Sequence, residues 1–65
     1  YHYATETLIA ASQGRTAQAQ RYWRAFENVS DPDARTTDAK LAAVIIVPRL
    51  REMFISYLQD AGVTL

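Results

Sequence analysis

Side chains capable of acid–base or nucleophilic chemistry are few in this sequence and stand apart from one another. His2 is the only histidine, and its imidazole could act as a general base near neutral pH, but no neighbouring residue would orient it. Ser12, Ser30 and Ser56 lack the strand–turn–helix context that activates a serine nucleophile. We therefore expect His2 to be a surface residue and the protein not to be an enzyme.

Acidic residues gather in the Asp31–Asp33 segment, where carboxylates could bind calcium. An EF-hand loop that began at Asp31 would need glycine at its sixth position and glutamate at its twelfth, and this chain has Thr36 and Ala42 there. With no cysteine and one histidine, the chain also lacks the ligands of a zinc site. We predict a solvated capping loop at this position, and neither a metal nor a cofactor.

Arginines interleaved with aromatic residues form the one pattern that points to nucleic acid. The three arginines of this segment are Arg15, Arg21 and Arg24. They could pair with phosphates while the rings of Trp23 and Phe26 stack on bases. At helical spacing, however, these rings belong to an apolar stripe that a core would bury, and seven basic residues are balanced by seven acidic ones. A small nucleic-acid-binding regulator is therefore the alternative to our preferred function.

The length of 65 residues predicts one small domain, and 49% hydrophobic with 22% charged residues predicts a folded one. A domain of this size buries only about 60% of its unfolded surface, and self-association is the stabilising aid that this composition leaves open. The longest apolar run, Leu41–Val47, is too short to span a membrane, and the first 14 residues do not resemble a signal peptide. We expect a cytoplasmic protein.

Two short helices are predicted in the N-terminal half, at residues 3–13 and 16–29. Gly14 is suited to end the first and Thr16 to cap the second. The second helix carries an apolar stripe of Ala19, Tyr22, Trp23, Phe26 and Val29. We favour this break over the alternative of one helix from 3 to 29, in which Gly14 would cost only about 1 kcal/mol.

Residues 14–32 resemble the second half of a tetratricopeptide repeat, through Gly14, Ala19, Trp23 and Pro32. In that family the glycine lies near the tight turn between helices, the alanine allows close helix packing and the aromatic residue packs between them. Phe26 departs from the pattern, because a second alanine is expected there. The resemblance implies a helical hairpin that binds a peptide or protein. No second repeat follows it.

The C-terminal half is predicted to be a loop at residues 28–38 and then a helix at 38–61, with Thr37 or Asp38 as its N-cap and Gly62 after its end. Two apolar stripes run along this helix. One contains Ala39, Ala43, Ile46, Leu50, Met53 and Tyr57, and the other contains Val47, Phe54, Leu58 and Ala61.

Pro48 lies inside this long helix, where it cannot donate to the carbonyl of Val44 and its ring crowds the preceding turn. Two outcomes stay open: one helix kinked at Pro48, or two helices at 38–46 and 48–61.

The resulting fold class is all-α, either a helical hairpin or a three-helix arrangement with a long, proline-kinked C-terminal helix, completed by oligomerisation. The core would set Leu8, Ala19, Trp23 and Phe26 against Ile46, Leu50, Phe54 and Tyr57. The uncovered face of the long helix would contact a second copy of the chain, or a larger protein, through Leu41, Val44, Ile45, Pro48 and Ile55. The preferred function is therefore a non-enzymatic interaction or homo-oligomerisation module.

Overall fold

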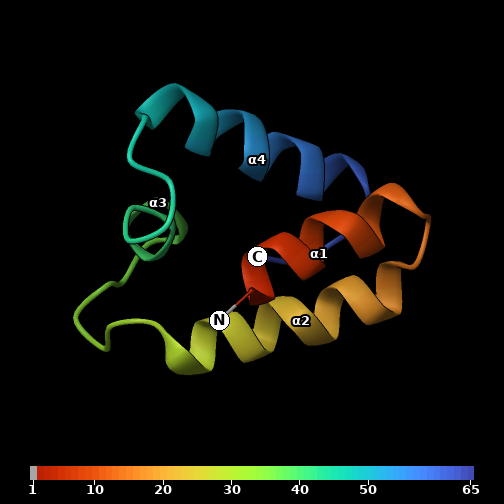
Figure 1. Ribbon diagram of the computed structural model, residues 1–65, viewed down its shortest axis with the longest axis horizontal. Coiled ribbons are helices and arrows are strands. Elements are labelled where there is room, and N and C mark those ends of the chain that lie inside the picture. The colour runs from red at the N-terminus through yellow and green to blue at the C-terminus, as the bar shows by residue number, and fades with distance from the viewer. Residues whose placement is uncertain (1) are drawn as a thin grey trace.

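Four helices make up the computed structural model, which describes residues 2–65 (Figure 1). They are α1 (Tyr3–Ser12), α2 (Thr16–Val29), α3 (Thr37–Leu41) and α4 (Pro48–Asp60). The described residues include no strand, so the prediction of an all-α fold is confirmed.

Helices α1 and α2 lie side by side as a hairpin (Figure 1). Gly14 ends α1 with φ 74°, a conformation that costs other residues about 1–2 kcal/mol. The amide of Gly14 donates to the carbonyl of Ala11, and the amide of Arg15 donates to that of Ala10. These two bonds are the Schellman motif. The predicted break at Gly14 is therefore confirmed, and a continuous helix from 3 to 29 is wrong.

Gly62 ends α4 in the same way, with φ 90°. Its amide donates to the carbonyl of Gln59, and the amide of Val63 donates to that of Leu58. Val63 and Leu58 are both buried, which is the apolar contact that accompanies this motif. The prediction that Gly62 closes the last helix is confirmed.

The single kinked helix over residues 38–61 is wrong, because the chain leaves the helical path between α3 and α4. Pro48 is the first residue of α4, where its missing amide hydrogen costs nothing, and Val47 before it is extended with ψ 118°. The alternative of two helices is the observed one. The first of them ends earlier than residue 46, since α3 stops at Leu41 and the β-branched run Val44–Val47 disfavours helix.

The predicted N-caps of α2 and α3 each lie after the observed ones. The N-cap of α2 is Arg15, and the Thr16 hydroxyl instead donates to the carbonyl of Ala61, 3.2 Å away. The N-cap of α3 is Thr36 rather than Thr37 or Asp38, and its hydroxyl accepts from the amide of Ala39 at 3.0 Å.

The core lies between the α1–α2 hairpin and one side of α4. Its buried residues are Thr7, Ala10, Ala11, Ala19, Trp23, Phe26, Leu41, Leu58 and Val63. The Thr7 hydroxyl is satisfied by the carbonyl of Tyr3 at 2.7 Å. Beyond α4, the C-terminal tail is tied to α2, because the Gln20 side chain donates to the carbonyl of Thr64 at 2.8 Å and accepts from its amide at 2.7 Å.

The expected pairing of core faces is half correct. Ala19, Trp23 and Phe26 are buried as predicted, whereas Leu8 is exposed and its neighbours Ala10 and Ala11 are buried instead. On the C-terminal side the predicted partners Ile46, Leu50 and Tyr57 are exposed, and Phe54 is half-buried against the core. The break before Pro48 frees α4 to turn, so it packs through the second apolar stripe, which contains Leu58.

Candidate functional site

Groups suited to catalysis or metal binding do not converge in the part of the chain that the structure describes. No three histidine, aspartate or glutamate side chains there lie close enough to hold a metal ion. His2 is exposed just before α1. The Asp31 carboxylate accepts a hydrogen bond from the amide of Asp33 at 2.9 Å, which is a local turn contact.

The three arginines and the aromatic rings lie on different sides of α2. Arg15 and Arg21 are exposed beside a shallow depression at the start of the helix. Arg24 is paired with Glu27 at 2.6 Å. Trp23 is completely buried and Phe26 nearly so, so neither ring is open for stacking on a base.

Glu27 joins α2 to α3 through a second ion pair, with Lys40 at 2.8 Å. Burial alone would raise the pKa of this carboxyl group. The hydrogen bonds and positive charges of Lys40 and Arg24 outweigh that effect and lower the pKa of Glu27. The carboxylate is thus held ionised in a structural contact.

Three of the five predicted interaction residues belong to the fold of a single chain. Leu41 is completely buried, and Ile45 and Ile55 are half-buried against the core. Leu41 is therefore not available to a partner, whereas contact of Ile45 and Ile55 with a partner stays a prediction. A turn follows Leu41, in which the amides of Val44 and Ile45 both donate to its carbonyl. Val44 and Pro48 are exposed as predicted.

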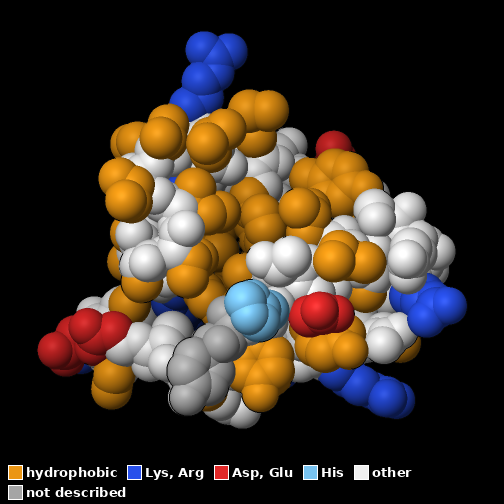
Figure 2. All heavy atoms as spheres, viewed as in Figure 1, with side chains coloured by type: hydrophobic (Ala, Val, Ile, Leu, Met, Phe, Trp, Pro, Cys, Tyr) orange, Lys and Arg blue, Asp and Glu red, His pale blue; other side chains and the backbone are white. Residues whose placement is uncertain are grey.

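A different set of large apolar side chains is exposed, and we call it the α4 stripe. It consists of Ile46, Val47, Leu50, Met53 and Tyr57. Ile46 is 86% exposed and the other four are each 44–59% exposed. Figure 2 shows hydrophobic side chains gathered over the region where Figure 1 draws α4 and around a hollow beside it.

The exposure of the α4 stripe does not come from a loosely packed chain. The radius of gyration is 10.7 Å, equal to the value of about 10.7 Å expected for a compact domain of this length. Contiguous apolar surface on a compact monomer marks an interaction site or an aggregation risk.

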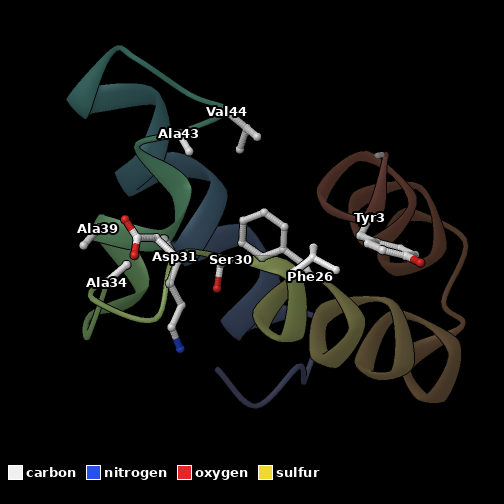
Figure 3. Close-up of a pocket in the computed structure, with 10 residues that line it drawn as sticks. Tyr3, Phe26, Ser30, Asp31, Ala34, Ala39, Ala43 and Val44 are labelled. Carbon is white, nitrogen blue, oxygen red and sulfur yellow. The ribbon is translucent and has the colours of Figure 1, made fainter.

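The hollow has a volume of about 500 Å³ and lies between the end of α2, the start of α1 and α3. Figure 3 shows Phe26 between Tyr3 of α1 and Val44 of the loop. Alanines provide part of its wall, namely Ala34, Ala39 and Ala43. Lys40, at its edge, is already paired with Glu27. With Phe26, Val29, Val44 and the alanines in its wall, the hollow is suited to apolar side chains of a partner.

Arg51 holds the loop that carries Val44 and Ile46. Its Nη1 donates to the carbonyls of Ile45 at 2.8 Å and Ile46 at 2.9 Å, and its Nε donates to the Asp38 carboxylate at 2.8 Å. This role of Arg51 was not predicted from the sequence. The available signal was its position, since Arg51 is the one charged residue on the face of α4 that also carries Phe54 and Leu58.

None of the helices described is long and apolar enough to cross a membrane. Comparisons with protein-family models, with curated proteins and with solved structures find no match for this chain.

Proposed function

We propose that this protein is a non-enzymatic interaction module that binds a protein partner through the α4 stripe and the adjacent hollow. The observation that carries the proposal is the exposure of five large apolar side chains on a compact chain. The resemblance of residues 14–32 to a tetratricopeptide hairpin agrees with it, because that resemblance implies peptide or protein binding.

Burial of the α4 stripe alone is too small a free-energy gain for stable binding. Covering a half-exposed aliphatic side chain is worth about 1 kcal/mol, so the five together offer about 5 kcal/mol. Association costs about 4–15 kcal/mol before any contact is counted. The partner must therefore contribute apolar surface of its own, as a second copy of the α4 stripe would.

Nucleic-acid binding remains the alternative, with less support. Arg24 is engaged by Glu27, and the aromatic rings that would stack on bases are buried. Arg15 and Arg21 are exposed and form no ion pair within residues 2–65, whereas the exposed Arg24 is paired.

The test is affinity capture from the native source, in which the bound protein and nucleic acid are both identified. Wild-type protein is compared with the double variant Leu50→Glu and Met53→Glu. An untagged copy of the same chain, if it is captured, counts as a protein partner. Glu52→Gln, on the polar side of the same helix, is the matched control. We expect one protein partner to be retained by the wild type and the control, to be lost from the double variant, and to change little with salt.

Two results would contradict this proposal. Equal retention by wild type and double variant would remove the α4 stripe as the site. Retention of nucleic acid that weakens with a log–log salt slope of about −0.9 per phosphate contact, and that is lost on Arg21→Ala with Arg24→Ala, would establish the alternative.

A further inference from the structure

The charges at the two ends of α4 oppose the dipole of the helix. Arg49 is its second residue, near the partial positive charge of the N-terminus, and Asp60 is its last, near the partial negative charge of the C-terminus. Both side chains are exposed, and neither forms an ion pair within residues 2–65. In a single chain, these two charges each weaken the helix.

Arg49 and Asp60 lie on the same side of α4, beside the α4 stripe. They are 11 residues apart, which is close to three full helical turns, so their side chains point in nearly the same direction. The stripe residues Leu50, Met53 and Tyr57 follow next around the helix, and the core-facing residues come after those. The two charges therefore border the stripe on the edge away from the core.

We propose that a second copy of this chain covers the α4 stripe, with the two α4 helices antiparallel about a two-fold axis at the middle of α4, at the level between Met53 and Ser56. This inference rests on the proposed function and names the partner. In an antiparallel pair, the N-terminus of one helix lies beside the C-terminus of the other. The charged edges of the two helices then lie on the same side of the interface. Arg49 of each copy then meets Asp60 of the other, which gives two ion pairs and places the helix dipoles in opposition.

A parallel pair would lack this complementarity. Its two-fold axis would run parallel to the helices and place the charged edges of the two copies on opposite sides of the interface, so that Arg49 and Asp60 would stay unpaired. The charges that are unfavourable in one chain thus become favourable in one specific arrangement of two.

The area of the α4 stripe fits a weak dimer. Five side chains that are 44–86% exposed offer on the order of 500 Å² per copy, so a pair would bury on the order of 1,000 Å², near the lower limit for a specific interface. We expect dissociation in the micromolar range.

Charge reversal tests the arrangement, with sedimentation equilibrium from low to high micromolar concentration. The wild-type mass should rise from 7.3 kDa towards twice that value. Arg49→Asp and Asp60→Arg should each weaken the dimer about tenfold or more, because each places two like-charged pairs at the edge. Both reversals in one chain should restore the wild-type constant to within about threefold. Glu52→Arg, on the polar side of α4, should leave it unchanged.

The direction in which the thermal stability of the monomer changes distinguishes a weakened dimer interface from a destabilised fold. Each reversal places a charge that suits the helix dipole, so the thermal stability of the monomer should stay the same or rise while the dimer weakens. A variant that weakened the dimer by unfolding would show the opposite change, and that result would overturn the proposal.

A cysteine test fixes the orientation, since the chain has no cysteine of its own. Met53→Cys lies near the axis and should oxidise to a covalent dimer, as antiparallel helices 8–10 Å apart allow. Asp60→Cys alone should not. Cross-linking of Asp60→Cys with itself, or single reversals without rescue by the double reversal, would overturn the antiparallel pairing.

A wild-type mass near 7.3 kDa at high micromolar concentration would overturn the self-pairing. If affinity capture then still found a protein held through the α4 stripe, the proposed function would stand with a different partner. If capture also failed, the proposed function would fall with it.

Discussion

Trp23 offers the sharpest test of how this small core is held together. Its side chain is 0% exposed and its ring centroid lies 5.1 Å from that of Phe26. The indole Nε1, however, has no hydrogen-bond acceptor within the part of the chain that is described. The residue therefore combines the largest apolar contribution to the core with a buried donor left unpaired.

These two features predict very different costs for two substitutions of Trp23. Trp23→Ala removes the ring and leaves a cavity, at a cost of about 3–5 kcal/mol, and the whole domain is worth only about 3–10 kcal/mol. Trp23→Phe keeps an aromatic ring beside Phe26. It loses about 1–3 kcal/mol of packing and regains about 1–3 kcal/mol by deleting the unpaired N–H group. We expect Trp23→Ala to be unfolded and Trp23→Phe to be within about 1 kcal/mol of wild type.

Urea unfolding followed by far-ultraviolet circular dichroism measures both changes. Tyr22→Phe is the matched control, because Tyr22 is the adjacent, half-buried aromatic residue and its hydroxyl has only a 3.5 Å contact with Gln18. If Trp23→Phe costs as much as Trp23→Ala while the control is neutral, the indole N–H is satisfied in solution and the reasoning fails. A tryptophan fluorescence spectrum typical of full water exposure would refute the burial itself.

Three further substitutions test local features of the fold. Glu27→Gln should reduce the loss of stability expected at acid pH. The lowered pKa of Glu27 gives stability above the unfolded-state pKa, which is lost as pH falls through the folded-state value, and urea unfolding across pH measures it. Arg51→Lys should cost about 1–2 kcal/mol by thermal denaturation, because lysine cannot hold two carbonyls and a carboxylate together, while Arg49→Lys should cost nothing. Gly14→Ala should cost about 1–2 kcal/mol by urea unfolding although no atom lies within 4 Å of the added methyl group, since the cost comes from φ 74°; a neutral result would contradict this.

Local signals in the sequence predicted the N-terminal half of the fold well. Gly14 needs a positive φ only because a helix ends there, and the period of Ala19, Trp23 and Phe26 identifies the buried side of α2. These features depend on residues within a few turns of each other. The helix end and the buried side of α2 can therefore be predicted from residue spacing alone.

The C-terminal half was harder because its apolar pattern is ambiguous. Residues 39–47 carry almost no polar side chain, so periodicity could not show where a helix stops, and the choice depended on whether Pro48 bends or begins a helix. When Pro48 begins a helix, α4 has two apolar stripes, and packing decides which of them faces the core. Leu58 is buried and Leu50 is exposed, which depends on packing against residues distant in the sequence. The exposed apolar surface therefore differs from the predicted one.

The link between Gln20 and Thr64 has a consequence for the order in which the chain folds. The two hydrogen bonds of this link join residues 44 positions apart, and the bond from Thr16 to Ala61 spans 45. Closing a loop of that length costs about 3 kcal/mol of chain entropy, whereas the α1–α2 hairpin closes through a turn at Gly14. The hairpin should therefore form first and offer a surface on which α4 docks last. Reversal of that last step frees Leu58 and Val63 together, so the C-terminal third opens as one cooperative unit.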